Sequence, residues 1–466
     1  MRVTLIYPSV GRKAGHTYVR AWQMEPLSMA LLASLTPSDF DVQFYDDRME
    51  EIPYDEPTDL VAISVETFTA LRAYRIAERF RKRGIPVVLG GYHVTLCPEE
   101  AREMADVIVI GDADTVWAQL LDDFVRNELK PEYRGLKRKS LTNLQPRREI
   151  FEGKNYQNIR LVEFARGCNF KCDFCSITAF HHASQTHRPA HEVATEMESI
   201  GGRRFFIVDD NFVSQPEQAR RLCAELTSLN VSWVGQASIH IAQDTELLKS
   251  MAASGCRGVL IGMESLSESN LRQMGKEWNT ATGSFAENLK RFRDAGLAVY
   301  GTFVFGYDDD DEDTIKRSVE FAVEQKLFLA AFNHLIPFPG TPLHRRLAAE
   351  DRLLKDRWWL DSNSRVGDVV FQPKRMSANR LGESCLEARK DFFRAGSIWR
   401  RMMDARANLR TPIMSTIYLG LNLQGKFDLG LRQGLQFGRG PEDGLGPIDS
   451  EMGLRFQRVA NETLSI

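Results

Sequence analysis

Short apolar segments alternate with amphipathic helical segments along most of this 466-residue chain, and this alternation constrains the fold more than any other feature. In the first 130 residues, strand patterns occur at Val3–Tyr7, Val42–Tyr45, Leu60–Val65, Val87–Gly90 and Val107–Ile110. Helical patterns lie between them, at Pro26–Leu35, Leu71–Arg83, Pro98–Met104 and Thr115–Glu128. This order favours a doubly wound, Rossmann-like α/β sheet whose ligands bind at the carboxyl ends of parallel strands.

The same alternation returns further along the chain, after a polar and irregular segment at 136–157 that we interpret as a linker. Six strands are predicted at Arg160–Phe164, Arg204–Val208, Ser232–Ala237, Gly258–Gly262, Ala298–Phe305 and Ala330–Leu335. Helices are predicted between them, near Ala190–Ile200, Gln215–Leu229, Asp244–Ala253, Ser284–Ala295 and Glu312–Gln325. Six such units do not close an eight-stranded barrel.

Three cysteines lie within one short loop that directly follows the first strand of this second region. Cys168, Cys172 and Cys175 have the spacing C-x3-C-x2-C. Three thiolates at this spacing can bind three irons of a [4Fe-4S] cluster and leave the fourth iron open for a ligand. The alternative is a zinc ion held by the three thiols and one of His181, His182 or His187. Zinc sites usually contain C-x2-C pairs, and no second pair occurs in this chain.

The overall composition is that of a globular protein of a reducing compartment. The net charge is −3, so we expect no binding to nucleic acid. The chain begins with a strand-like run rather than a signal or transit segment, and it has no apolar run long enough to span a membrane. The other cysteines, Cys97, Cys223, Cys256 and Cys385, are scattered, as small buried residues are. We therefore expect a cytoplasmic protein.

The cysteine loop, with Phe174 just before its third cysteine, resembles the cluster loop of radical S-adenosylmethionine (radical SAM) enzymes. That resemblance implies a partial (β/α)6 barrel and S-adenosylmethionine bound at the open iron. It also implies S-adenosylmethionine contacts for polar residues at the strand ends and for a glycine strand on the adenine side. These residues are Asp209 and Asp210 after the second strand, Gln236 and Ser238 at the third, Glu264 at the fourth, and Gly301 in the fifth. The resemblance implies a further S-adenosylmethionine contact for Phe174 of the cysteine loop.

The first 135 residues resemble the cobalamin-binding domain that precedes the barrel in one group of radical SAM enzymes. The resemblance rests on the strand order and on the segment at 90–100, and it implies that Ser64, Thr67, Gly90 and Gly91 cradle the corrin tail. The Asp-x-His-x-x-Gly loop that supplies a cobalt ligand in many corrinoid proteins is absent, because Ala14 and Val19 stand beside His16 at its other positions. We therefore expect cobalamin without a histidine ligand.

We predict three domains: a cobalamin-type domain at 1–135, a barrel at 158–345, and a mainly helical C-terminal cap at 346–466. The cap should contain a helical region at 378–407 and a flexible glycine-rich loop at 434–446. Seven Lys or Arg and two Asp occur between 400 and 440, among apolar residues. Such a segment suits peripheral contact with an anionic membrane or a cover over the substrate pocket, and the plain alternative is a solvated cap.

By resemblance, the reduced cluster cleaves S-adenosylmethionine to a 5′-deoxyadenosyl radical that removes hydrogen from a small-molecule or lipid-like substrate. An external flavodoxin or ferredoxin would supply the electrons, and cobalamin would supply a methyl group to carbon. The alternatives are a cobalamin-independent rearrangement, oxidation, C–C coupling or transfer of another part of S-adenosylmethionine. A corrinoid or cluster sensor without turnover, or a tRNA-modifying enzyme, would be further readings, and the net charge counts against the latter.

Overall fold

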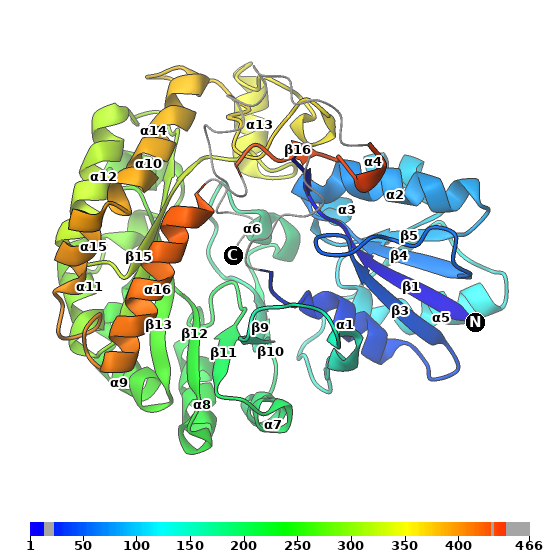
Figure 1. The fold of residues 1–466 in the computed structure, drawn as a ribbon, viewed down its shortest axis with the longest axis horizontal. Coiled ribbons are helices and arrows are strands. Elements are labelled where there is room, and N and C mark those ends of the chain that lie inside the picture. Colours follow the sequence, from blue (N-terminus) through cyan, green and yellow to red (C-terminus); the bar gives the residue numbers. More distant parts are fainter. Residues whose placement is uncertain (14–22, 430–432, 444–466) are drawn as a thin grey trace.

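A computed structural model describes residues 1–13, 23–429 and 433–443, and places the two alternating regions in two separate parallel sheets (Figure 1). The N-terminal sheet has the strand order β3-β1-β4-β5-β6-β7, and every pair is parallel. Its strands are β1 (Arg2–Tyr7), β3 (Asp41–Asp46), β4 (Leu60–Ser64), β5 (Val87–Gly90), β6 (Val107–Ile110) and β7 (Glu132–Arg134). The five predicted strands are confirmed, and β7 is an addition.

Helices cover both faces of the N-terminal sheet, as a doubly wound fold requires. They are α1 (Leu27–Leu35), α2 (Ala70–Lys82), α3 (Tyr92–Leu96), α4 (Pro98–Met104) and α5 (Trp117–Val125). Two apolar cores result, one beneath α2 around Ile63 and Phe80, and one beneath α1 and α5 around Leu5 and Trp117. Both faces of the sheet are therefore covered.

The second sheet has six parallel strands in the order β15-β14-β13-β12-β11-β8, which confirms the predicted partial barrel. They are β8 (Arg160–Val162), β11 (Arg204–Ile207), β12 (Ser232–Ala237), β13 (Cys256–Glu264), β14 (Ala298–Phe305) and β15 (Leu329–His334). The helices of this region are α6 (Ser176–His181), α7 (Ala190–Ile200), α8 (Pro216–Leu226), α9 (Thr245–Ala253), α10 (Glu268–Gln273), α11 (Phe285–Asp294) and α12 (Glu312–Glu324). One large apolar core joins them to the sheet.

The C-terminal part is mainly helical, as predicted. It contains α13 (Pro342–Ala349), α14 (Ala378–Phe392), α15 (Ala395–Met402) and α16 (Pro412–Asp428). The predicted helical region at 378–407 thus becomes two helices, and α16 was not predicted. Tyr418 of α16 packs on Ala298 and Phe328, which lie at the amino ends of β14 and β15. This helix therefore does not cover the carboxyl mouth of the barrel.

The prediction of a flexible loop at 434–446 is wrong for its first ten residues, and 444–446 lie outside the described residues. Here β16 (Gln436–Phe437) pairs antiparallel with β2 (Gly11–Arg12), which follows the first strand of the chain. A side chain at Gly11 would meet the carbonyl oxygen of Gln436 at 1.8 Å, so only glycine permits this pairing.

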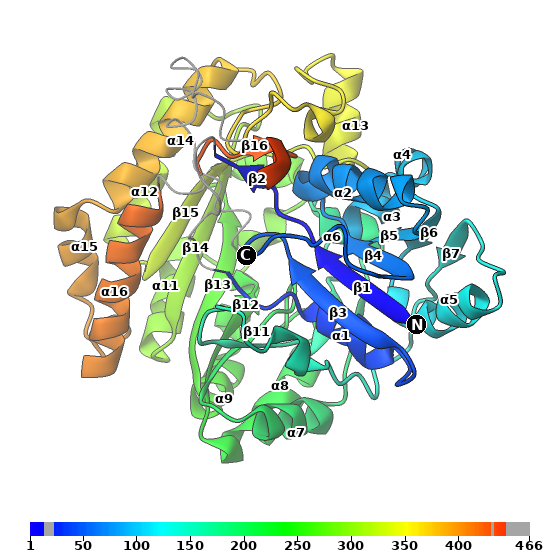
Figure 2. The same cartoon turned by 45° about the vertical axis from the view of Figure 1, so that its right-hand side comes forward.

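The C-terminal part also ties the two sheets together (Figure 2). The rings of Trp358 and Phe437 pack against the ring of Phe68 in the N-terminal domain, with centroid distances of 5.2 and 5.9 Å. Nearby, the buried carboxylate of Glu100 accepts hydrogen bonds from Tyr74 and from the indole of Trp359. No helix among the described residues is long and apolar enough to cross a membrane.

Candidate active site

The cysteine loop and α6 lie in sequence between two short strands, β9 (Ala165–Gly167) and β10 (Gln185–His187), which pair antiparallel. Gly167 has a φ of 83°, and a side chain there would meet the carbonyl oxygen of Ser184 at 2.1 Å. Glycine is therefore required at the position just before Cys168. Cys175 is the N-cap residue of α6, and Cys172 lies between the two other thiols in sequence and is buried.

Contacts from several barrel segments fix the loop. The carboxylate of Asp173 accepts a hydrogen bond from the Tyr307 hydroxyl at 2.5 Å. The ring of Phe170 stacks on Trp278 with centroids 4.0 Å apart and an interplanar angle of 18°. Phe174 packs against the barrel core. The side chains between the cysteines thus anchor the loop, and the three thiols are left free of disulfides.

The chemistry of the donor set fits an iron–sulfur cluster. Burial raises the pKa of Cys172 to about 12, against the opposing effect of the Lys276 ammonium, and burial also raises the pKa of Cys175. Binding of iron would supply the positive charge that such thiols need to ionise. In the described part of the chain, no group of three or more His, Cys, Asp or Glu side chains is arranged around a single metal ion. A cubane instead offers a separate iron to each thiolate.

The predicted polar residues after β11 lie beside the cysteine loop. Some of their side-chain atoms already form hydrogen bonds within the protein. Asp209 accepts from the Phe164 amide at 2.8 Å, and Asp210 accepts from the Gly167 amide at 2.8 Å. Burial raises the pKa of Asp209 well above its usual range and that of Asp210 to about 6. Asn211 donates to the Cys168 sulfur at 3.7 Å and to Ser238.

Three buried oxygen atoms here have no hydrogen-bond partner among the described residues: Asp209 Oδ2, Asn211 Oδ1 and Gln185 Oε1. Buried acceptors are rarely left unpaired in native proteins, so they indicate a missing donor. The ammonium group of S-adenosylmethionine is such a donor, and the residues therefore fit this cofactor. Gln185 was not predicted, because it comes from the short β10 strand rather than from a barrel strand end. Its Nε2 donates to the carbonyl of Asn211 at 2.7 Å.

Glu264 ends β13 in a distorted backbone. Its φ is 64°, and the pairing with β14 shifts register between Gly262 and Glu264. Its buried carboxylate pairs with the ammonium of Lys276 at 2.9 Å. Burial opposes the charge of Lys276, but Glu264 and the nearby thiols more than offset this, so the pKa of Lys276 is raised. Lys276 was not predicted, since it lies in an irregular segment after α10.

Two of the other predicted barrel residues, Gln236 and Gly301, have close neighbours within the protein. Gln236 lies near the carboxyl end of β12, where its carbonyl accepts from the Phe212 amide. Gly301 lies within β14, and a Cβ atom there would meet Met263 Cε at 2.3 Å and Leu327 Cδ1 at 2.8 Å. Glycine at 301 therefore has a packing role, and its contact with S-adenosylmethionine stays a prediction.

The four residues predicted to bind cobalamin lie at the carboxyl ends of β4 and β5. Gly91 has a φ of 105°, and a Cβ atom there would lie 2.8 Å from the carbonyl oxygen of Val65. At Gly90 the nearest atom to such a Cβ is Val109 Cβ at 3.6 Å. Ser64 ends β4, and the buried Thr67 hydroxyl lies 3.4 Å from His93 Nδ1. The fold thus requires glycine at position 91, whereas a Cβ atom at position 90 would make only ordinary van der Waals contact with Val109. His16 lies outside the described residues.

The carboxyl edge of the N-terminal sheet faces the cysteine loop. Tyr92, the first residue of α3, packs against Phe180 of α6 with ring centroids 4.5 Å apart and an interplanar angle of 42°. Figure 1 shows α6 between the two sheets. Arg166, two residues before Cys168, pairs with Glu163 at 2.9 Å and with Asp114 of the N-terminal domain at 3.3 Å. The two predicted ligand edges therefore meet at one interface.

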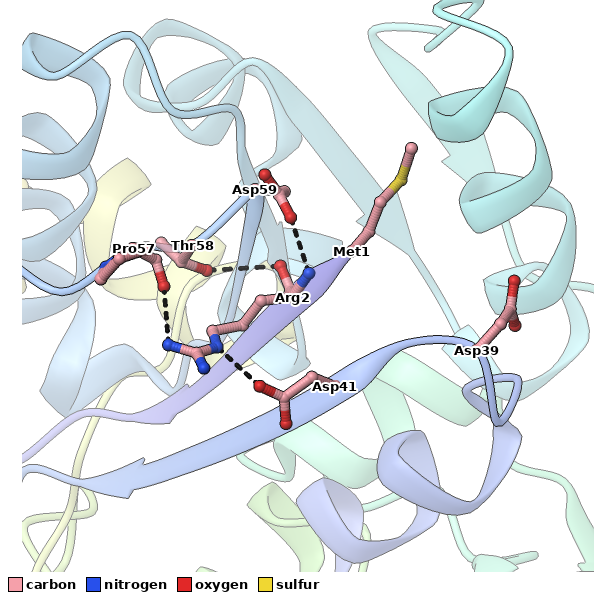
Figure 3. A pocket seen from close by; sticks show the side chains of 7 residues that line it. All are labelled: Met1, Arg2, Asp39, Asp41, Pro57, Thr58 and Asp59. Atoms are coloured by element: carbon pink, nitrogen blue, oxygen red, sulfur yellow. Dashed lines mark hydrogen bonds and ion pairs between the residues drawn. The ribbon is translucent and has the colours of Figure 1, made fainter.

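A cavity of about 380 Å³ lies at the other end of the N-terminal sheet (Figure 3). Its polar groups are already bonded to one another: the Arg2 side chain pairs with Asp41 at 2.7 Å, and Asp59 accepts from the Arg2 amide at 2.7 Å. It lies at the amino ends of β1 and β3, away from the cysteine loop. We therefore do not place the active site there.

Comparison with known proteins identifies both regions. The radical SAM superfamily matches residues 162–322, and the B12 binding domain matches residues 20–121. A bacteriochlorophyllide d C-12(1)-methyltransferase of Chlorobaculum tepidum is 29% identical, over 82% of this chain and 86% of the relative. A hopanoid C-2 methylase of Rhodopseudomonas palustris is 25% identical, over 76% of this chain and 71% of the relative.

A solved structure shares the fold of this chain. It is the radical SAM methyltransferase TsrM of Kitasatospora setae, with cobalamin and a [4Fe-4S] cluster bound. The TM-score is 0.61 and the identity 17%, over 84% of this chain and 81% of TsrM.

Proposed function

Because this chain is a radical SAM enzyme with an N-terminal B12-binding domain, we propose that it adds a methyl group to a carbon atom of a small-molecule or lipid-like substrate. The observation that carries the proposal is the contact between the two predicted ligand edges, where Tyr92 of α3 packs against Phe180 of α6. A methyl carrier on one edge and a radical source on the other would then share one reaction space. The named relatives, which methylate a bacteriochlorophyllide and a hopanoid, support the substrate class.

When bound, the cluster supplies an electron to S-adenosylmethionine and cobalamin carries the methyl group. Replacing C–H by C–CH3 then consumes two molecules of S-adenosylmethionine. One loses its methyl group and leaves as S-adenosylhomocysteine, and the other takes up the hydrogen atom and leaves as 5′-deoxyadenosine and methionine. Two electrons balance the exchange, so we also propose an external flavodoxin- or ferredoxin-type donor and a cytoplasmic site of action.

The residues of this chain bind and orient these groups. Cys168, Cys172 and Cys175 would hold three irons, and the buried oxygens of Asp209, Asn211 and Gln185 would accept hydrogen bonds from the S-adenosylmethionine ammonium. The Glu264–Lys276 pair offers one acceptor and one donor for the same cofactor.

The proposal is tested with anaerobically reconstituted enzyme, a reductant and S-adenosylmethionine with a deuterated methyl group. A bacteriochlorophyllide and a hopanoid serve as the substrate panel, each with and without added cobalamin. We expect the enzyme to add a labelled methyl group to one of the two substrates. This methylation should occur only in the samples that contain cobalamin. S-adenosylhomocysteine and 5′-deoxyadenosine should form in equal amounts.

The control replaces Cys168, Cys172 and Cys175 together by Ala, which should abolish iron binding and both products. Cys97→Ala removes a partly buried cysteine outside the loop and should leave both unchanged. Methylation that continues without cobalamin would contradict the proposal. So would 5′-deoxyadenosine formation without S-adenosylhomocysteine.

A further inference from the structure

Large apolar side chains are exposed mainly on two neighbouring helices near the C-terminus. Among the described residues, seven of the eleven exposed large apolar side chains lie between positions 399 and 427. They are Trp399, Met403, Ile413, Ile417, Leu419, Leu423 and Phe427, and we call this set the C-terminal helix face. Trp399, Ile413 and Phe427 are 62%, 72% and 76% exposed. A concentration of this kind marks a surface that is covered in use.

The protein itself already occupies the other side of these helices. The Tyr418 hydroxyl donates to the carbonyl of Ile398 at 2.8 Å, and Asn422 donates to the carbonyl of Phe328 at 3.1 Å. Both residues of α16 are fully buried. One face of α16 is therefore buried within the protein, and its exposed face also carries apolar side chains. Figures 1 and 2 place α15 and α16 on the side of the barrel away from the N-terminal sheet.

From residue 394 to residue 427 the exposed charges have one sign, and the next residue, Asp428, ends α16. Between residues 394 and 427 the exposed charged side chains are Arg394, Arg400, Arg406, Arg410 and Lys426. The only acidic residue in that range, Asp404, is buried. Arg394 and Arg406 pair with Asp391 and Asp294, whereas no ion pair with a described carboxylate occurs at Arg400, Arg410 or Lys426. This basic surface stands out against a net charge of −3 for the whole chain.

We infer that the C-terminal helix face rests on an anionic lipid surface. Interfacial helices combine exposed Trp, Phe and Leu side chains with Lys and Arg, and anionic headgroups attract each such cation. Trp399 is suited to the headgroup level, where indole rings concentrate. A second copy of this chain fits less well, because a symmetric contact would bring the same cations together.

This inference goes beyond the proposed methyl transfer and does not depend on it. Lipid binding requires neither the cluster nor cobalamin, so its failure would leave the enzymatic proposal intact. If both hold, the enzyme collects a lipid-like substrate at the surface in which that substrate is dissolved. The helix face would then set the location of the enzyme rather than its chemistry.

The test is flotation of the full chain with vesicles of phosphatidylcholine alone or with added phosphatidylglycerol. We expect binding that requires phosphatidylglycerol and falls with rising salt. Ile413→Ser, Leu423→Ser and Phe427→Ser together should lower the partition coefficient roughly a hundredfold or more. Arg400→Gln and Lys426→Gln should each lower it about fivefold.

Control variants remove exposed side chains of the same kinds elsewhere on the protein. Val125, Leu136 and Leu354, each changed to Ser, remove three exposed apolar side chains, and Lys82→Gln with Lys249→Gln removes two exposed charges. Both sets should bind vesicles like the original chain. The inference is overturned if the original chain does not bind anionic vesicles, or if the helix-face and control variants behave alike. A dimer in solution that the triple variant converts to monomer would also overturn it, by assigning the face to a second copy.

Discussion

Glu264 and Lys276 form a buried ion pair at the carboxyl end of β13, close enough for both charges to act on the Cys172 thiol. Removing one partner leaves the other charge buried without compensation, which typically costs about 3–5 kcal/mol. The pair therefore has a structural role in addition to the role in S-adenosylmethionine binding that we propose for Glu264. Two kinds of measurement separate these roles.

Glu264→Gln should lower S-adenosylmethionine affinity roughly ten- to a hundredfold, as expected for one lost charge-assisted hydrogen bond. Isothermal titration under anaerobic conditions measures this. The same variant should unfold at lower denaturant concentration, and the double variant Glu264→Gln with Lys276→Met should regain stability without regaining affinity. If stability and affinity recover together, Glu264 is only a structural partner of Lys276.

Gly90 and Gly91 should respond differently to substitution, although the sequence led us to treat them alike. Gly91→Ala forces a side chain against the backbone of Val65 at a φ of 105° and should destabilise the protein by about 1–3 kcal/mol. In Gly90→Leu the new Cβ atom would lie no closer than 3.6 Å to Val109 Cβ, so we expect the variant to keep the stability but lose cobalamin. Thermal unfolding and the visible spectrum of bound cobalamin report the two effects. Unchanged cobalamin binding in Gly90→Leu would remove Gly90 from the corrin site.

At the scale of elements, the cysteine loop depends on β14 as well as on its own sequence. Tyr307, directly after Gly306 at the end of β14, donates to Asp173 between the second and third cysteines. Tyr307→Phe removes this bond, and we expect the cluster to be lost faster to a chelator, as followed by its visible absorbance. Tyr418→Phe removes a comparable buried bond on α16 and should have no such effect. Equal rates in the two variants would show that Asp173 does not fix the loop.

The periodicity of the sequence was sufficient to predict both sheets, because each strand is a short apolar run bounded by polar or glycine residues. It failed where an element has no such pattern. The strands β9, β10 and β16 have only two or three residues, and α16 carries apolar residues on its exposed face as well as on its buried one. Within the site, the cysteines follow a strand, Glu264 ends one, and all four were predicted. Lys276 comes from an irregular segment and Gln185 from the short β10 strand, and neither was predicted. The domain boundaries at 135, 158 and 345 stay predictions.

In the whole molecule, the contacts between the two sheets fix the position of one relative to the other. Arg166 lies between them with its side chain 13% exposed, and its guanidinium pairs with Glu163 of its own region and with Asp112 and Asp114 of the N-terminal domain. Arg166→Gln should loosen this contact and expose the segment at 136–157 to limited proteolysis. Arg138→Gln removes a more exposed pair with Asp114 and should have a smaller effect. Identical cleavage of both variants and the original chain would show that Arg166 does not hold the domains.

The proposed methyl transfer requires that the N-terminal sheet and the cysteine loop present their cofactors to one shared space. Electron paramagnetic resonance of protein that holds both reduced [4Fe-4S] cluster and cob(II)alamin tests it most directly, with samples that hold one cofactor as references. The contact of Tyr92 with Phe180 predicts dipolar coupling between the two spins, visible as a change in both signals. A spectrum equal to the sum of the two reference spectra, at full occupancy of both cofactors, would contradict the account.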